Sequence, residues 1–333
     1  MWDIIWGSRE LMLPDRILIE RGDLPMKRMY FIYNPVAGKA AVSEKLGDII
    51  DRFVKADYEV TVRPTQSSDD AIQSANYACS QGYDLLVCSG GDGTLSQCLQ
   101  GVMKSSNRIP IGYIPAGSTN DFAKSLGIPK GMTEAADWII GGRPVPCDIG
   151  GFNDVYFTYI VAFGAFTNIT YETSQPIKNL FGHSAYILSG LLQLTSIKAQ
   201  RIRVEYEGNV IEDDFIFGMV TNSSSVAGFL SMSNFLLDDG VFEVTLIKKP
   251  ANIMHLHQIV TSLLNMQGDI DREYIKCFRT NIVTFASVGG EPITWTRDGE
   301  YGGDSAVNTV FNYNRAVSFM VGDCKDTKFS GEA

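Results

Sequence analysis

The residues of this sequence that are best suited to chemistry lie in three glycine-containing loops and two acidic turns. The first loop, Gly90–Thr94, reads GGDGT. Glycines let a backbone approach a polyphosphate closely and direct N–H groups at it, and a helix starting at Thr94 or Leu95 would add partial positive charge there. Asp92 could act through Mg²⁺, or hold a water or a phosphate-binding side chain. The simpler explanation is a tight turn without a ligand.

The second loop, Asn34–Lys39, also follows an apolar run and precedes a helical pattern. It resembles a P-loop only superficially, because Tyr33 replaces the first glycine and Ala40 follows Lys39 where Ser or Thr is required. Its polar residues are candidates to line a nucleotide. Lys39 is a candidate phosphate contact, with a solvated residue at a helix start as the alternative.

The third loop is Pro115–Phe122, which reads PAGSTNDF. Its small hydroxyl residues and the Asn120–Asp121 pair can hold ribose or phosphate oxygens, while a helix cap is the simpler explanation for that pair. A dinucleotide fingerprint GxGxxG is absent, because Ser96 stands at the third glycine position.

Two turns carry paired carboxylates. In Arg297–Glu300 (RDGE), one carboxylate could be a general base on a substrate hydroxyl and the other could bind a metal. Leu236–Val241 (LLDDGV) offers a carboxylate and backbone carbonyls to a hard cation. Asp-Gly is also a common hairpin signal, so a plain turn is the alternative for both.

The spacing of apolar residues predicts the elements that position these loops. Strands and helices alternate through the first half, which indicates a parallel sheet covered on both faces, with ligands at the carboxyl ends of the strands. The loops that follow the strands can therefore meet at one site. The predicted strands are Met29–Tyr33, Tyr58–Arg63, Leu85–Cys88 and Ile109–Ile114, and the helices are Ala41–Val54, Asp69–Cys79, Leu95–Met103 and Thr133–Ile140.

The second half predicts a mostly antiparallel β domain, with a boundary near residue 145 at the turn-rich Gly141–Pro144. Residues 1–27 are expected to be an extension, 28–145 and 146–322 two domains, with the last segment packing back on the first, and 323–333 a tail. The predicted strands are Tyr156–Ala165, Ile202–Tyr206, Phe215–Thr221, Val241–Ile247, Asn281–Phe285 and Val317–Val321, and the helices are Ala185–Ser196 and Ile253–Met266.

Composition narrows the class of protein. The chain has 333 residues, enough for two domains, and its 45% hydrophobic and 20% charged residues are globular values. A net charge of −10 without a Lys/Arg cluster argues against nucleic acid, and limits membrane binding to local or transient contact. Six cysteines without a CxxC pair indicate a reducing, cytoplasmic compartment. No stretch reaches the ~18 apolar residues that a membrane span needs, and no signal peptide is predicted.

Taken in order along the chain, these motifs resemble the bacterial diacylglycerol kinase catalytic-domain family of soluble lipid kinases, related to sphingosine and ceramide kinases. The resemblance extends over roughly residues 28–322. It implies a Rossmann-like (NAD kinase/diacylglycerol kinase-like) α/β domain followed by a β-sandwich domain that holds the lipid, with ATP between them.

The same resemblance implies roles for individual residues. Glu300 is the preferred proton acceptor, with Asp298 essential beside it, and Asp92 is expected to be catalytic as well. A structural Mg²⁺ would lie at Asp239, with the carbonyls of Leu236 and Val241. Ser96 and Gln97 replace the Asn-Glu usual in the family. The expected ATP contacts are Asn34, Pro35, Val36, Ala37, Gly38, Thr65, Gly91, Asp92, Gly93, Thr94, Leu95, Ser96, Gln97 and Ser118.

The expected reaction is transfer of the γ-phosphate of ATP, with Mg²⁺, to a lipid hydroxyl, converting diacylglycerol to phosphatidic acid. The alternatives are a soluble-substrate kinase resembling NAD kinase, and a non-catalytic regulator that binds nucleotide or lipid. The expected partners are a lipid substrate, a transiently contacted membrane surface and a second copy in a homodimer, without nucleic acid. The expected location is cytoplasmic, peripheral to the membrane.

Overall fold

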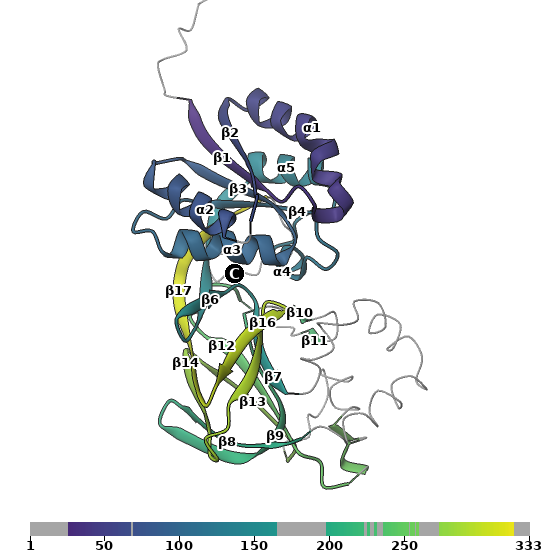
Figure 1. Cartoon of the computed structure of the whole chain (residues 1–333), viewed down its shortest axis with the longest axis vertical. Helices are drawn as coiled ribbons and strands as arrows, with labels where there is room; N and C mark the ends of the chain where they lie inside the picture. The colour runs from purple at the N-terminus through teal and green to yellow at the C-terminus, as the bar shows by residue number, and fades with distance from the viewer. Residues whose placement is uncertain are drawn as a thin grey trace, which may run out of the picture.

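A computed structural model shows a mixed α/β structure that is rich in strands (Figure 1). The described residues are 26–67, 69–164, 198–222, 225–226, 230–231, 236–252, 254–256, 258–259 and 273–322. Within them, fifteen strands join in one sheet and two short strands form a second. No helix in these ranges has the length and apolar character needed to cross a bilayer.

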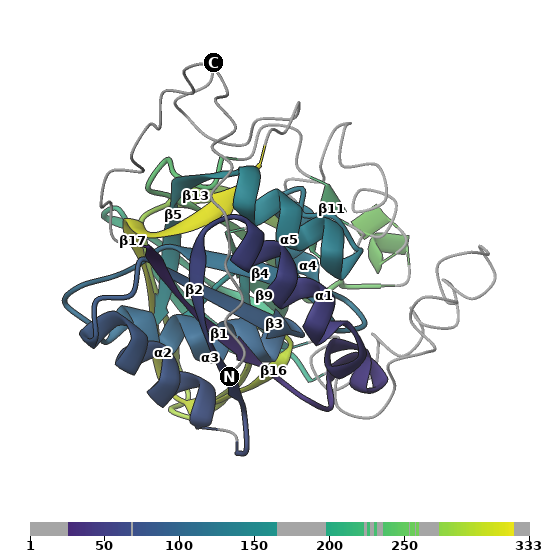
Figure 2. The ribbon, with the colours of Figure 1, turned by 90° about the horizontal axis from the view of Figure 1, so that it is seen from above.

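The first part of the chain forms a parallel sheet between helices. Its strands lie in the order β2–β1–β3–β4, and all three pairings are parallel. Figure 2 shows α1 and α5 on one side of these strands and α2 and α3 on the other, which confirms the predicted arrangement. The strands are β1 (Lys27–Tyr33), β2 (Tyr58–Pro64), β3 (Leu85–Gly90) and β4 (Ile111–Pro115). The helices are η1 (Ala37–Ala40), α1 (Ala41–Lys55), α2 (Asp70–Ser80), α3 (Asp92–Met103), α4 (Asp121–Ser125) and α5 (Met132–Gly141).

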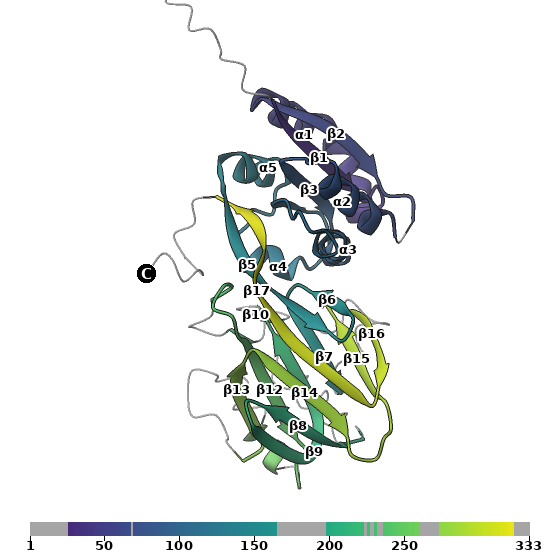
Figure 3. The same cartoon turned by 90° about the vertical axis from the view of Figure 1, so that its left-hand side faces the viewer.

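The second part consists of antiparallel pairings, as predicted. Its strands are β5 (Arg143–Phe152), β6 (Val155–Phe157), β7 (Ile160–Gly164), β8 (Gln200–Tyr206), β9 (Asn209–Thr221), β10 (Ser225–Val226), β11 (Leu230–Ser231), β12 (Phe242–Lys248), β13 (Ile275–Thr280), β14 (Ile282–Ser287), β15 (Ile293–Arg297), β16 (Glu300–Ser305) and β17 (Val307–Val321). The last strand, β17, pairs with β5 along its length and ends beside β4, where Phe319 lies opposite Ile111. Figure 3 shows β5 and β17 running between the two parts.

The burial patterns follow from how each strand is covered. All six residues of β3 are buried, as expected for a parallel strand with helices on both faces. In β8, Ile202 and Val204 are buried while their neighbours face solvent, as in a sheet covered on one face. Two large hydrophobic cores result. One lies around the parallel sheet, and the other lies between the antiparallel strands, where the ring of Trp295 packs 4.9 Å from that of Phe163.

Some predicted elements differ from the structure. The strand predicted over Tyr156–Ala165 is divided into β6 and β7, because the N–H groups of Thr158 and Tyr159 bond to the carboxylate of Asp298 and not to a neighbouring strand. The turn predicted at Gly141–Pro144 is short, since β5 already begins at its third residue and continues past 145. Helix α4 was not predicted, because it has only five residues.

Several predicted segments lie wholly or partly outside the described residues. These are the N-terminal extension, the helix predicted at Ala185–Ser196 and the tail at 323–333. Of the helix predicted at Ile253–Met266, the structure describes 254–256 and 258–259, and both pieces are helical.

The packing of α2 on α3 depends on Gly101. A methyl group at Gly101 would overlap the Ile72 carbonyl oxygen and lie 2.8 Å from Ala75 Cβ. Gly101→Ala should therefore lower the free energy of unfolding by about 1–3 kcal/mol, even though alanine favours helix by about 1 kcal/mol. Urea unfolding measures the change. Gly141, at the end of α5, has open space around it and is the control. Equal effects of Gly101→Ala and Gly141→Ala would contradict this packing.

Candidate active site

The predicted loops meet at one cleft of about 670 Å³. The loops after β1, β2, β3 and β4 contribute to it, and Glu300, at the start of β16, reaches it from the strand-rich part. The expected ATP contacts that line it are Asn34, Pro35, Val36, Ala37, Thr65, Gly91, Gly93, Thr94 and Gln97. The cleft is also lined by Gln66, Ser67 and Gly117, which were not among the expected contacts.

Other expected contacts lie elsewhere around the cleft. Leu95 is fully buried in the core and Ser96 is buried in α3, so neither side chain lines it. Gly38, Asp92 and Ser118 are not in its lining either, although each lies in a loop or helix start that borders it.

The glycine loop is shaped by close backbone approaches. Helix α3 begins at Asp92, with Gly91 in extended conformation before it. A Cβ at Gly117 would lie 2.6 Å from Gly91 Cα, so the first and third loops touch through their backbones. This leaves the free N–H groups at the start of α3 beside the cleft, an arrangement suited to phosphate.

Asn120 holds the third loop in shape. Its backbone is left-handed, with φ = 50°, and its side chain makes no capping bond to α4. Instead, its Oδ1 accepts from the Gly117 N–H at 3.0 Å and the Tyr113 hydroxyl at 3.2 Å, while Nδ2 donates to the Gly117 carbonyl at 2.7 Å. The helix-cap interpretation therefore does not describe this side chain, which organises the loop.

Asp92 is a half-buried residue whose carboxylate has one buried, unsatisfied oxygen. Its Oδ2 accepts weakly from the Asp121 N–H at 3.4 Å, and its Oδ1 has no hydrogen-bond partner among the described residues. Burial, followed by the negative charge of Asp121, raises the pKa of Asp92 from 3.8 to about 6. Such a carboxylate is set up to receive a hydrogen-bond donor or a cation.

The two carboxylates of the Asp-Gly-Glu turn have different surroundings. Asp298 is 4% exposed, and its oxygens accept from the N–H groups of Thr158, Tyr159 and Ile160 at 2.8, 3.0 and 3.3 Å. Burial raises the pKa of Asp298, and these three donors oppose that effect.

Glu300, in contrast, is exposed and reaches the start of α3 across the cleft. A Cβ at Gly93 would collide with Glu300 Oε1, so Gly93 is the residue that admits this side chain. No described residue forms a hydrogen bond or ion pair with the Glu300 side chain. Of the two carboxylates, Glu300 is therefore the one free to accept a proton.

Comparisons with known proteins identify the family. A family model for the diacylglycerol kinase catalytic domain matches residues 28–152. A diacylglycerol kinase of Bacillus subtilis (strain 168) is 34% identical over 280 residues, covering 84% of this chain and 91% of that protein. The chain belongs to the diacylglycerol kinase family. A diacylglycerol kinase of Staphylococcus aureus (strain Newman) is 35% identical over 287 residues, with coverages of 85% and 89%.

A solved structure agrees in fold. A crystal structure of a diacylglycerol kinase from Bacillus anthracis str. Sterne matches with a TM-score of 0.69 at 21% identity, covering 89% of this chain and 97% of that one. The family predicted from the motifs is thus confirmed, and the chain is an ATP-dependent lipid kinase.

The acidic turn expected to bind a structural metal forms an ion pair with Arg279 of β13. In this kinase, one oxygen of Asp239 contacts the Arg279 guanidinium, and the other accepts from the Val241 N–H at 3.2 Å. Arg279 Nε also donates to Glu243 at 3.1 Å. Over the described ranges, no group of three or more His, Cys, Asp or Glu side chains is arranged to hold a metal.

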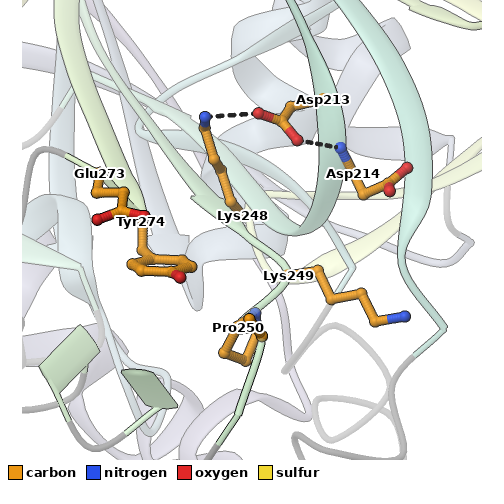
Figure 4. Close-up of a pocket in the computed structure, with 8 residues that line it drawn as sticks. Asp213, Asp214, Lys248, Lys249, Pro250, Glu273 and Tyr274 are labelled. Atoms are coloured by element: carbon orange, nitrogen blue, oxygen red, sulfur yellow. Dashed lines mark hydrogen bonds and ion pairs between the residues drawn. The ribbon is translucent and has the colours of Figure 1, made fainter. Parts of the chain in front are cut away.

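A second cavity of about 520 Å³ lies among β9, β12 and β13 (Figure 4). Lys248 Nζ lies 2.5 Å from Asp213 Oδ2 there, and Tyr274 and Glu273 stand on the other side. None of the predicted site residues of the kinase lines this cavity.

Asp92→Asn should stabilise the kinase at high pH while abolishing its activity. Because its pKa is raised, Asp92 favours the folded state when it is protonated. Its contribution to the free energy of unfolding is therefore present below about pH 4 and is lost as pH rises through about 6. A difference between 3.8 and about 6 corresponds to roughly 3 kcal/mol as an upper limit. Thermal unfolding at pH 8 should show the gain of Asp92→Asn. At pH 4 the gain should vanish. A gain in stability that does not change with pH would show that the pKa of Asp92 is not raised.

Proposed function

We propose that this kinase transfers the γ-phosphate of ATP to the free hydroxyl of diacylglycerol and forms phosphatidic acid. The observation that carries the proposal is the meeting of Glu300 with the glycine loop at Gly93, across one cleft. A phosphate-binding backbone and an unengaged carboxylate are thereby brought together from the two parts of the chain. The names of the relatives from Bacillus subtilis and Staphylococcus aureus supply the substrate class.

ATP is proposed to lie along the loops after β1, β2, β3 and β4. Its phosphates would meet the N–H groups at the start of α3, where Gly91 and Gly93 leave the backbone open. The full set of expected contacts, from Asn34–Gly38 through Thr65 and Gly91–Gln97 to Ser118, remains part of this proposal. Leu95 and Ser96 could contribute only through their backbone, since their side chains are buried.

Glu300 is proposed to be the general base. As the lipid oxygen bonds to the γ-phosphorus, its proton passes to Glu300, and the bond from the γ-phosphorus to the oxygen bridging it to the β-phosphorus breaks to release ADP. Asp298 would not take this proton, because both of its oxygens already accept N–H groups. Its proposed role is to fix the turn from which Glu300 projects.

Mg²⁺ is proposed to accompany ATP. The buried, unpartnered Asp92 Oδ1 fits a hard cation, which Asp92 would hold directly or through water. When bound, Mg²⁺ would neutralise charge on the phosphates. The turn at Asp239, with the carbonyls of Leu236 and Val241, is proposed as a second, structural Mg²⁺ site, at which the cation would compete with the Arg279 guanidinium.

The architecture is proposed to comprise a Rossmann-like ATP-binding domain over 28–145 and a β-sandwich lipid domain over 146–322. The separate cores of the parallel and antiparallel parts support this division, and β17 returns to the first core through Val317–Val321. We also propose that the enzyme is cytoplasmic, that it meets its lipid at the membrane surface, and that it forms a homodimer.

The test is phosphate transfer from radiolabelled ATP with Mg²⁺ to micellar diacylglycerol, sphingosine, ceramide and phosphatidylglycerol, with NAD as a soluble control. Label is expected in diacylglycerol. Glu300→Gln removes the base with little change in shape and should lower kcat by at least ~100-fold. Label in NAD alone, or full activity of Glu300→Gln, would overturn the proposal.

Arg279→Met should strengthen Mg²⁺ binding at the Asp239 turn. Without the guanidinium, Asp239 and Glu243 lose their cation, and stability in EDTA should fall by about 1–2 kcal/mol, because Arg279 is half exposed. Thermal unfolding without ATP should show that Mg²⁺ restores this loss. Arg203→Met, which breaks only the surface pair with Glu205, is the control. An Arg279→Met protein indifferent to Mg²⁺ would argue against a cation site.

A further inference from the structure

Two buried tyrosines, Tyr113 and Tyr159, lie near the carboxylate of Asp92, and their hydroxyl groups differ in how they are bonded. The Tyr113 hydroxyl lies 3.2 Å from both the Gly90 carbonyl and Asn120 Oδ1, so it serves the loops. The Tyr159 hydroxyl forms no hydrogen bond with any residue that the structure describes, although Tyr159 is only 5% exposed. Its oxygen is not among the buried side-chain atoms that lack a partner, so it is open to a hydrogen-bond partner from outside the protein.

The main chain holds Tyr159 firmly in place. Its N–H donates to Asp298 Oδ1 at 3.0 Å, and its carbonyl accepts from the Asn222 N–H at 2.8 Å. Its ring belongs to the core around the parallel sheet, although the residue comes from the link between β6 and β7. The direction of the side chain is therefore set from both ends.

The Tyr159 hydroxyl lies behind the catalytic turn. A Cβ at Gly299, the residue before Glu300, would be 3.5 Å from the hydroxyl oxygen. Burial, followed by the charges of Asp298, Asp92, Asp121 and Glu300, raises the pKa of the phenol well above its usual value. The group is thus a neutral hydrogen-bond donor with carboxylates in its vicinity.

An attacking alcohol needs a proton acceptor and a hydrogen-bond donor beside it. An alcohol oxygen can donate one hydrogen bond and accept others. In the proposed reaction it gives its proton to Glu300, which leaves its lone pairs to be oriented by a donor. Glu300 is one of the four carboxylates whose charges act on the Tyr159 phenol, and the Tyr159 hydroxyl is a donor without a partner among the described residues.

We propose that the Tyr159 hydroxyl donates a hydrogen bond to the acceptor hydroxyl oxygen of the lipid while that hydroxyl is bonded to Glu300. This inference rests on the proposed function and deepens it. The bond would fix the alcohol in an orientation for in-line attack on the γ-phosphorus. It also makes the site selective, because a bound lipid without the free hydroxyl covers the tyrosine donor and leaves it unpaired in the complex.

The experiment removes one oxygen atom from each side of the proposed bond. Tyr159→Phe should lower kcat/KM for diacylglycerol about tenfold, the equivalent of one hydrogen bond, with the Kd of ATP unchanged. Dissociation constants are then compared for two lipids, with a non-hydrolysable ATP analogue present so that no phosphate is transferred. One lipid is diacylglycerol with its free hydroxyl, and the other is the same lipid with hydrogen in place of the hydroxyl. The wild type should prefer the alcohol several-fold, and Tyr159→Phe should lose most of this preference.

Tyr113→Phe is the matched control. It also removes a phenol oxygen from a buried tyrosine near Asp92, but one that bonds to the loops. It should alter stability or ATP binding and leave the preference for the alcohol intact. A preference ratio compares two lipids on one protein, so a loss of stability alone does not move it.

The outcomes separate this inference from the proposed function. An active wild type, together with a Tyr159→Phe protein that keeps the full preference for the alcohol, would overturn the role of Tyr159 and leave the kinase assignment standing. A wild type that phosphorylates NAD and no lipid would overturn the proposed function, and the inference about Tyr159 with it.

Discussion

The arrangement of the candidate active site depends on one buried carboxylate. Asp298 accepts three consecutive N–H groups, from Thr158 to Ile160, and these bonds join the turn between β15 and β16 to the link between β6 and β7. The same bonds end β6, because N–H groups that point at a carboxylate cannot extend a ladder. Glu300 lies two residues after Asp298, and Tyr159 is one of the three residues whose N–H groups Asp298 binds. One side chain thus fixes the backbone from which Tyr159 and Glu300 project.

The cleft concentrates negative charge, and this works against stability. Asp92, Asp121, Asp298 and Glu300 all influence the same phenol, and burial holds the pKa of Asp92 near 6. A protein selected for stability alone would replace such groups with neutral ones. Retaining them is reasonable where a substrate brings cations and hydrogen-bond donors, since charge that is unfavourable in the free protein is then compensated in the complex.

Local sequence patterns predict much of this fold but only part of the candidate site. The alternating strands and helices, and loops such as Gly90–Thr94, can be predicted because the spacing of apolar residues and the glycine content are local properties of the sequence. The sequence does not reveal that Asp298 is saturated while Glu300 is free, because the donors lie about 140 residues away. It does not reveal the break of the predicted strand at Thr158 for the same reason. The pairing of Asp239 with Arg279 is likewise a product of strand register, in which β12 lies beside β13.

The two parts of the chain must also be held at a fixed distance, and buried polar groups do this. Gln100, in α3, donates to the Tyr156 carbonyl at 2.6 Å and accepts from the Tyr156 N–H at 3.1 Å, which holds β6 against α3. Asp148 accepts from Gly240 and Arg315 at 2.6 and 2.7 Å, at the point where β17 departs from regular pairing with β5. Hydrogen bonds with defined geometry specify position more narrowly than apolar contact does. Glu300 can therefore meet Gly93 across the cleft because α3, β6 and β17 are tied together by groups that tolerate little displacement.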